Sequence, residues 1–334
     1  MESALPGSAG IIDLHAHYLA PAVVAEIQAG AFRPHLSTAG LPGPARFQFP
    51  TTLSRPVFAA MTDISDRVSG LDRRGIGIQV LSTWIDMFGY DLPREVAVRY
   101  HTRVNEGLAA AVASCPARLA FLASVPLPWG EEAAAVLADA VTRLGAAGAM
   151  IGTNIGGANL DDPRFGPLWA ACEQLGCPVE LHPVSVAGAS RLGSYQLDNF
   201  LGNPFDTTIA AASLIFGGVL DRHPGLTVIL VHGGGYLPFA AGRMTHGRRA
   251  RRVAPRLRHD PADYLSRFYY DTIVYHPRVL ATVAELAGRD RIVLGSDYPF
   301  DMEPADLLAT ASAALGPDAP RLLAANARRL LRRA

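Results

Sequence analysis

The sequence predicts an α/β fold, a (β/α)8 TIM-type barrel in a single domain that spans residues 1–334. Short runs rich in β-branched residues alternate along the chain with longer segments of helical apolar periodicity. Strands that are separated by helices pair in parallel through right-handed crossovers, and eight such units close into a barrel. An open doubly wound sheet is disfavoured because no GxGxxG motif opens a helix after the first strand.

Eight segments have the length and the apolar character of buried strands. In chain order they are residues 11–15, 78–82, 119–124, 149–153, 178–182, 227–232, 268–272 and 291–296. The segments between them place apolar residues at helical spacing. The clearest helices are expected at residues 95–113, 131–144, 165–175, 207–222, 236–247 and 277–287.

The stretch from residue 30 to residue 60 interrupts this alternation. It is rich in proline and glycine, includes LPGPARFQFP (41–50), and follows neither a helical nor a strand period. We predict that residues 30–60 form an insertion after the first strand, and that this insertion caps the mouth of the barrel.

The composition is that of a globular protein with a sizeable core, since 49% of the 334 residues are hydrophobic and 18% are charged. The formal net charge is zero, which gives no reason to expect a nucleic acid or an anionic membrane as a partner. The sequence has no apolar run of bilayer length and no basic and apolar leader, so we expect a cytoplasmic protein.

The chain has no lysine, and all 30 of its basic residues are arginines. This excludes Schiff-base catalysis, a lysine general base and a carbamylated lysine that bridges two metal ions. The sequence therefore favours a mononuclear site if a metal is bound.

Ligand-type side chains stand at the carboxyl ends of the predicted strands, where a barrel places its active site. His15 and His17 share one face of the first strand because alternate side chains of a strand point the same way. His182 ends the fifth strand and Asp297 follows the eighth. These four side chains supply nitrogen and oxygen ligands for one divalent ion, for which Zn²⁺ is the best match, and leave one position for water.

A further histidine, His232, ends the sixth strand directly before three glycines. The residues alone allow it to be another ligand or a base beside the metal. Gly233–Gly235 lack the GK[ST] signature of a phosphate loop, so the sequence does not favour nucleotide binding.

Several longer motifs resemble the amidohydrolase superfamily, in particular the branch of metal-dependent decarboxylases typified by 2-amino-3-carboxymuconate-6-semialdehyde decarboxylase. The resemblance covers most of the chain. Its most specific pieces are GIGIQVLSTWIDMF (75–88), MIGTNIGG (150–157), NPFDTTIAAASLIFGGVLDRHP (203–224), HGGGYLPFAAGRMTHG (232–247), FYYDT (268–272) and LGSDYPF (294–300).

The resemblance implies roles for individual residues. His15, His17, His182 and Asp297 match the metal ligands, and His232 matches the histidine that orders the metal-bound water and shuttles its proton. Arg243, eleven residues after His232, matches the arginine that binds the substrate carboxylate across the interface of a homodimer. Arg55, in the variable insertion, is a candidate for a second carboxylate-binding arginine.

The chain departs from the aminocarboxymuconate enzymes after the fifth strand. Those enzymes continue from the strand-five histidine with Pro-Trp-Asp, whereas His182 is followed here by Pro183, Val184 and Ser185. The segment AGASRLGSYQLDNFL (187–201) also lacks the expected tryptophans. The pocket wall has therefore changed, which leaves the identity of the substrate open.

We expect a metal-dependent carboxy-lyase that decarboxylates a small unsaturated or aromatic carboxylic acid by protonating the carbon that bears the carboxylate. His232 and Asp297 are the two candidates for handling the proton. The alternative is a metal-dependent hydrolase or hydratase that uses the metal-activated water, and the candidate carboxylate-binding Arg243 favours decarboxylation over it. A barrel without catalytic function would lack a ligand-type residue at one or more of these strand ends, whereas here every position is filled.

Overall fold

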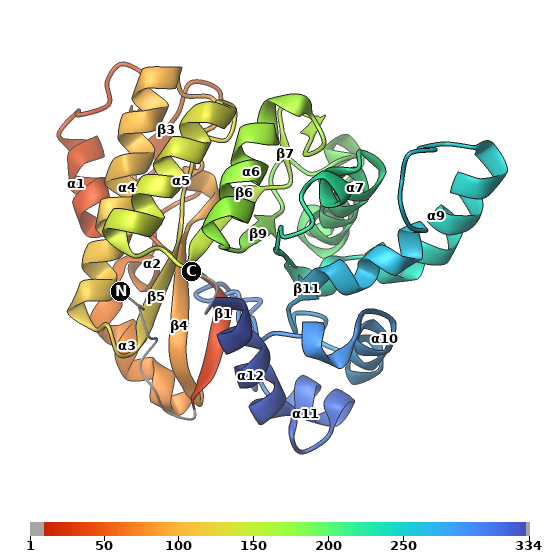
Figure 1. Cartoon of the computed structure of the whole chain (residues 1–334). Coiled ribbons are helices and arrows are strands. Elements are labelled where there is room, and N and C mark those ends of the chain that lie inside the picture. The colour runs from red at the N-terminus through yellow and green to blue at the C-terminus, as the bar shows by residue number, and fades with distance from the viewer. Residues whose placement is uncertain (1–9, 332–334) are drawn as a thin grey trace.

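The computed structural model describes residues 10–331, so the ends of the predicted domain, residues 1–9 and 332–334, lie outside the described residues. Seven parallel strands form one curled sheet in the order β1-β4-β5-β6-β9-β10-β11, with helices packed around it (Figure 1). The strands are β1 (Ile11–Tyr18), β4 (Ile76–Thr83), β5 (Leu119–Ala123), β6 (Gly148–Gly152), β9 (Val179–His182), β10 (Val228–Leu230) and β11 (Phe268–Tyr270). The predicted parallel α/β fold is confirmed.

The segment predicted as the eighth strand closes the ring without forming a regular strand. We call residues 291–298 the closing segment. It pairs with the sheet through isolated bridges, one from Ile292 to Tyr270 of β11 and two to β1, from Leu294 to Asp13 and from Tyr298 to Ala16. The N–H of Leu14 donates to the carbonyl of Leu294 at 2.9 Å. The ladder is interrupted because Asp297 adopts a left-handed backbone conformation, with φ of +59°.

The first strand is longer than predicted. Parallel pairing with β4 continues to Tyr18, so both histidines of the pair lie inside β1 and not after its end. The register between β1 and β4 shifts between Asp13 and Ala16, which marks a β-bulge at His15. Such bulges re-aim side chains and are common beside active sites.

Except for α9 (Leu237–Arg251), which extends away from the barrel, the longer helices lie around the outside of the sheet (Figure 1). They are α1 (Pro21–Gln28), α3 (Ile64–Arg73), α4 (Arg94–Ser114), α5 (Gly130–Leu144), α6 (Gly166–Leu175), α7 (Asn203–Phe216), α10 (Pro277–Ala287) and α12 (Ala319–Leu331), with the shorter α8 (Val219–Arg222) and α11 (Ala309–Leu315). The predicted helix 207–222 is divided into α7 and α8 because Gly218 takes a φ of +68°, which ends the helical path. No helix within residues 10–331 is long and apolar enough to cross a membrane.

The barrel interior is filled by apolar side chains from the strands. They include Ile12, Leu14, Ile78, Val80, Leu122, Met150, Ile229, Tyr269 and Val293. A second layer of apolar residues packs the outer face of the strands against the helices. The buried interior below the carboxyl ends of the strands therefore fixes the positions from which site residues project.

Residues 30–60 fold onto the barrel through aromatic and aliphatic side chains. A short antiparallel pair, β2 (Ser37–Thr38) with β3 (Phe47–Gln48), gives this stretch its local order. Phe32, Leu36 and Phe49 are at most 1% exposed. The short helix α2 (Ala59–Thr62) then leads into α3.

Candidate metal centre

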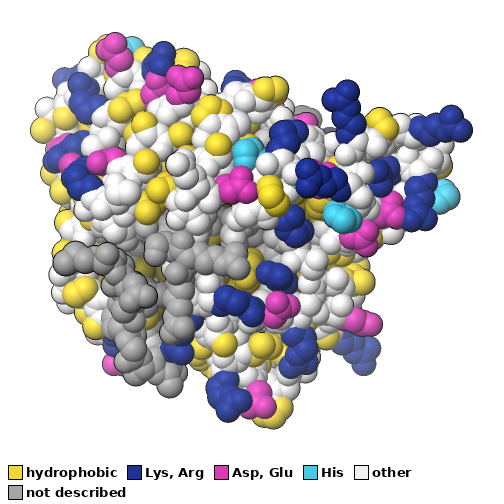
Figure 2. All heavy atoms as spheres, in the orientation of Figure 1, with side chains coloured by type: hydrophobic (Ala, Val, Ile, Leu, Met, Phe, Trp, Pro, Cys, Tyr) yellow, Lys and Arg dark blue, Asp and Glu magenta, His cyan; other side chains and the backbone are white. Residues whose placement is uncertain are grey.

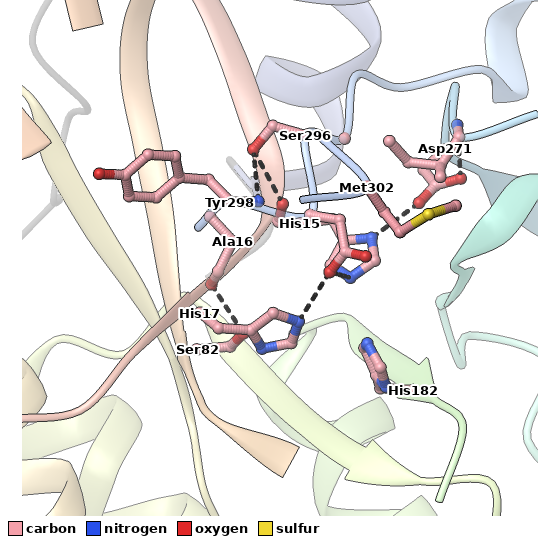
Figure 3. Close-up of polar contacts among 12 residues, drawn as sticks. His15, Ala16, His17, Ser82, His182, Asp271, Ser296, Tyr298 and Met302 are labelled. Atoms are coloured by element: carbon pink, nitrogen blue, oxygen red, sulfur yellow. Dashed lines mark hydrogen bonds and ion pairs between the residues drawn. The ribbon is translucent and has the colours of Figure 1, made fainter. Parts of the chain in front are cut away.

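The structure brings together four of the residues singled out in the sequence. One ligand-type atom from each of His15, His17, His182 and Asp297 lies within 4.8 Å of the others, and all four residues are buried. His15 and His17 reach this point from β1, and His182 faces them from the end of β9 (Figure 3). The bulge in β1 and the positive φ of Asp297 are the local features that aim these side chains at one point.

Each of the three imidazoles is oriented by an oxygen on its outer side. The Nδ1 atoms lie 2.9 Å from Asp271 Oδ2 for His15, 3.2 Å from the Thr83 carbonyl for His17, and 3.1 Å from the Pro183 carbonyl for His182. When Nδ1 donates to these oxygens, Nε2 keeps its lone pair. Metal-binding histidines are held in this way, with one ring nitrogen on an outer acceptor and the other on the ion.

The inner atoms of this group have no hydrogen-bond partner within the described part of the chain, although Asp297 Oδ1 lies 3.4 Å from His15 Nε2 and 3.3 Å from His17 Nε2. These inner atoms are His15 Nε2, His17 Nε2, His182 Nε2 and Asp297 Oδ1. Buried polar atoms without partners are costly and rare, so a convergent set of them indicates a missing ligand. Three imidazole nitrogens and one carboxylate oxygen suit a divalent cation such as zinc. The residues therefore fit a mononuclear divalent metal site.

The protonation states agree with this assignment. Burial lowers the pKa of both His17 and His182, which keeps their imidazoles neutral at pH 7. Burial opposes ionisation of Asp297, but His15 and His17 hold the pKa of that carboxyl well below its usual range. For His15, burial is outweighed by Asp297 and Asp271, which raise its pKa, so binding of a cation would displace a proton from this ring.

His232 lies beside this group, on a tight turn that follows β10. Its ring centroid is 5.5 Å from that of His15 and 5.6 Å from that of His182. Burial lowers the pKa of His232, so the ring is neutral at pH 7, and its Nδ1 has no hydrogen-bond partner among the described residues. The side chain is therefore free to bind or transfer a proton at the site.

The three glycines after His232 are required by close packing. A Cβ at Gly235 would lie 1.9 Å from the carbonyl oxygen of Pro204, and one at Gly234 would lie 2.6 Å from the ring of Tyr270. Both glycines also have positive φ. The turn can therefore bring His232 to the centre only with glycine at these positions.

Two buried acids at this end of the barrel are not identified by the sequence analysis. Asp271 directly follows β11 and contacts His15 as described above. Glu180 lies two residues before His182 on the same strand, and burial raises its pKa to about 8. The strand-end rule applied to FYYDT (268–272) would have selected Asp271, and alternation along β9 would have selected Glu180.

Two cavities open beside the centre. The first, of about 340 Å³, contacts His232 and Asp297 and is otherwise lined mainly by apolar and aromatic side chains, among them Pro204, Tyr236, Phe239, Ile273 and Tyr275. The second, of about 770 Å³, is more polar and includes Arg55, Asp86, Tyr90, Asn154 and Val184. Asn199 lines both cavities.

The two arginines singled out in the sequence lie in different settings. Arg55 lies in the wall of the larger cavity, where its guanidinium pairs with Asp86 at 2.8 Å and lies 5.4 Å from the ring centroid of Trp84. Arg243 is exposed on α9 and lines neither cavity. The structure of one chain therefore brings Arg55 to the site region and leaves Arg243 outside it.

Comparison with known proteins gives one family. The Amidohydrolase family profile matches residues 12–333. A 2-amino-3-carboxymuconate-6-semialdehyde decarboxylase of Dictyostelium discoideum is 37% identical over 241 residues, which are 71% of this chain and 66% of that relative, just under two thirds. A gamma-resorcylate decarboxylase of Rhodococcus jostii is 29% identical over 263 residues, 73% of this chain and 79% of the relative.

A solved structure shows the same arrangement of the whole chain. The 2,6-dihydroxybenzoate decarboxylase from Rhizobium superposes with a TM-score of 0.77 at 25% identity, over 97% of this chain and 99% of that one. The family match spans nearly the entire sequence and agrees with this fold. The chain belongs to the amidohydrolase family, and its relatives place it in the decarboxylase branch of that family.

Proposed function

We propose that this protein is a metal-dependent carboxy-lyase that removes CO₂ from a small unsaturated or aromatic carboxylic acid. The observation that carries the proposal is the convergence of three imidazole nitrogens and a carboxylate oxygen beside the free ring of His232, next to an aromatic-lined cavity. Its relatives, which are named as decarboxylases of carboxymuconate, resorcylate and methylsalicylate compounds, support the same reaction class.

We propose that His15, His17, His182 and Asp297 hold one divalent ion, Zn²⁺. When bound, this ion would polarise a substrate oxygen and stabilise the negative charge that develops during the reaction. The donor set supports zinc because imidazole nitrogens and carboxylate oxygens are ligand types that suit this ion.

The reaction needs a proton at the carbon that bears the carboxylate. The electron pair of the adjoining C=C bond takes up that proton, the bond to the carboxylate then breaks, and its electron pair restores the conjugation as CO₂ leaves. His232 and Asp297 are the groups placed to transfer the proton, because both face the first cavity. The aromatic side chains of that cavity, such as Tyr236 and Phe239, would hold a planar ring and exclude water.

We further propose that two arginines bind carboxylate groups, Arg55 within its own chain and Arg243 across a homodimer interface. Exposed aromatic side chains support such an interface. Phe239, one helical turn before Arg243, is 56% exposed, and Phe205 of α7, whose ring centroid lies 6.5 Å from that of Tyr236, is 47% exposed. Arg243 forms no ion pair with any residue in the described range 10–331. Four residues of the insertion 30–60 line the larger cavity and support a capping role for it: Thr51, Thr52, Leu53 and Arg55.

The test is a product assay on purified protein with a set of small acids, including 2,6-dihydroxybenzoate, 6-methylsalicylate and an aminocarboxymuconate semialdehyde. We expect CO₂ and the decarboxylated product in equal amounts, with activity lost on chelation and restored by adding Zn²⁺ or, as a comparison, Mn²⁺. A hydrolysed or hydrated product without CO₂ would contradict the proposal. Elemental analysis should find about one ion per chain, and two ions per chain would contradict a mononuclear centre.

A further inference from the structure

A buried carboxylate, Asp271, connects two parts of the site that come from distant segments of the sequence. Its Oδ2 lies 2.9 Å from Nδ1 of His15, a ligand on β1 (Figure 3). Its Oδ1 accepts the backbone N–H of Gly233 at 2.7 Å, in the turn that holds His232, and that of Ile273 at 3.1 Å. One side chain thus spans the metal ligand on the first strand and the glycine turn after β10.

Both contacts need the acceptor character of a carboxylate. Asp271 is 1% exposed, so water does not compete for its oxygens. A carboxylate offers two acceptor oxygens and no donor, whereas an asparagine would turn its NH₂ group either toward His15 Nδ1 or toward the backbone N–H groups of Gly233 and Ile273. Replacing aspartate by asparagine would therefore break the bond to His15 or the bond to Gly233.

The position of Asp271 is also fixed by packing from a third segment. A Cβ at Gly295 would lie 3.0 Å from the Cβ and Oδ2 atoms of Asp271 and 3.0 Å from the Cβ of His15. The closing segment, which leads to Asp297, therefore packs directly on the Asp271–His15 pair. A shift of this carboxylate would therefore displace the two proposed ligands His15 and Asp297, and His232 as well.

We propose that Asp271 is a positioning residue that fixes the His15 imidazole for metal binding and at the same time holds the His232 turn against it. The inference rests on the proposed function, because it assigns His15 to the metal and His232 to proton transfer. What it adds to the contact with His15 is the second contact of the same carboxylate, with Gly233, which couples the geometry of the ligand to the position of the proton-transferring ring.

The test compares the zinc affinity of the wild-type protein and of the Asp271→Asn variant by competition with a chromophoric chelator. This readout does not depend on turnover. We expect the dissociation constant for Zn²⁺ to rise by about 10- to 100-fold, the range found when outer partners of metal ligands are removed. At saturating zinc we expect kcat to fall while KM stays unchanged, because Asp271 lies behind the ring and not in a cavity wall.

The matched control is Asp206→Asn, which alters another buried acid that hydrogen-bonds Thr153 and Asn154 and contacts no ligand side chain. It should leave the zinc affinity unchanged.

An Asp271→Asn protein with wild-type zinc affinity would overturn the inference. If Asp271→Asn does not fold, Asp271→Glu keeps the charge and is measured in its place, and failure of both to fold would show a purely structural role and also overturn it. A wild-type protein that binds no divalent ion would instead overturn the proposed metal centre itself.

Discussion

His232 and Asp297 both hold a left-handed backbone conformation that residues with side chains rarely adopt, with φ of +55° and +59°. Each such residue costs about 1–3 kcal/mol unless the surrounding structure enforces it. Here the glycine turn enforces the first, and the bond from the Asp297 N–H to the His15 carbonyl, at 2.9 Å, enforces the second. The two residues proposed to move the proton are therefore among the eight non-glycine residues with positive φ in the described part of the chain.

Replacement of His232 by alanine tests its role directly. His232→Ala should retain the metal, because the four other side chains supply the ligand atoms. The turnover rate should fall by about 10²- to 10⁴-fold, the usual contribution of a general acid or base. Metal content by elemental analysis and kcat at saturating substrate check both parts. Asp297→Ala is the comparison and should weaken metal binding as well, so the reverse pattern would exchange the two roles.

The ion pair between Arg55 and Asp86 gives a second prediction. In the free protein the Arg55 guanidinium, which would bind a substrate carboxylate, donates to Asp86 from both Nε and Nη2. Asp86 and the substrate therefore compete for the same donors. Asp86→Asn should lower KM for a carboxylate substrate by about two- to fivefold, since exposed pairs of this kind contribute at most about 1 kcal/mol.

The control for this prediction is Asp91→Asn, an acid in the same cavity that bonds Thr51 and does not contact Arg55. Its KM should stay unchanged. A rise of KM in Asp86→Asn would mean that Asp86 positions Arg55 for the substrate and does not compete with it.

At the scale of elements, the contact between α4 and β5 contains a buried histidine whose charge state depends on folding. His101 is fully buried and its Nδ1 lies 2.8 Å from the hydroxyl oxygen of Ser124. Burial lowers the pKa of His101 to about 3 from its ordinary value of 6.5. The unfolded chain therefore binds a proton at this ring below pH 6.5, whereas the folded chain does not until about pH 3.

This difference predicts acid sensitivity with a defined sign. Because the unfolded state binds more protons in this window, stability is lost as pH falls from 6.5 toward 3, at a limiting slope of roughly 1.4 kcal/mol per pH unit for this one group. His101→Gln should show a shallower loss of melting temperature across that window than the wild-type protein. The exposed His259→Gln should follow the wild-type curve, and identical curves for all three proteins would contradict the prediction.

The parts of the fold and site that could be predicted are those determined by residues close together in the sequence. The alternation of apolar strands and helices, and histidines at strand ends, are encoded within short windows, which is why His15, His17, His182 and Asp297 could be grouped. The bulge at His15 and the irregular closing segment depend on partners far along the chain, so no local pattern indicates them. Asp271 follows the same strand-end pattern, so the sequence marks its position, but its contacts with His15 and Gly233 depend on segments far along the chain and define its role only in the structure.

At the scale of the whole molecule, α9 extends away from the barrel (Figure 1). Basic side chains gather on this projecting part of the surface in Figure 2. The last turn of α9 contains the exposed Arg249 and Arg251. Arg243 lies on the same helix, outside the site of its own chain. The carboxylate-binding role proposed for Arg243 would therefore require a second copy of the protein.

Mixing two inactive variants tests that role. One variant combines His15→Ala and His17→Ala, and the other is Arg243→Ala. In a homodimer that shares arginines, half of the mixed population would be hybrids with one complete site, so about a quarter of wild-type activity should return. Activity after mixing and the dimer mass by analytical ultracentrifugation are the measurements. If mass spectrometry shows that subunits exchange and no activity returns, Arg243 acts within its own chain or has no role.

The irregular closing segment also limits how far the thermal stability of this protein could be raised, whether by engineering or by natural variation. A sequence that paired residues 291–298 fully with β1 and β11 would add ladder hydrogen bonds and raise the melting temperature. It would also force Asp297 into extended backbone and turn its carboxylate away from the other three ligands. Substitutions that increase strand propensity in the closing segment would therefore raise the melting temperature and lower the catalytic activity. Stabilising substitutions that preserve activity should be sought elsewhere in the barrel.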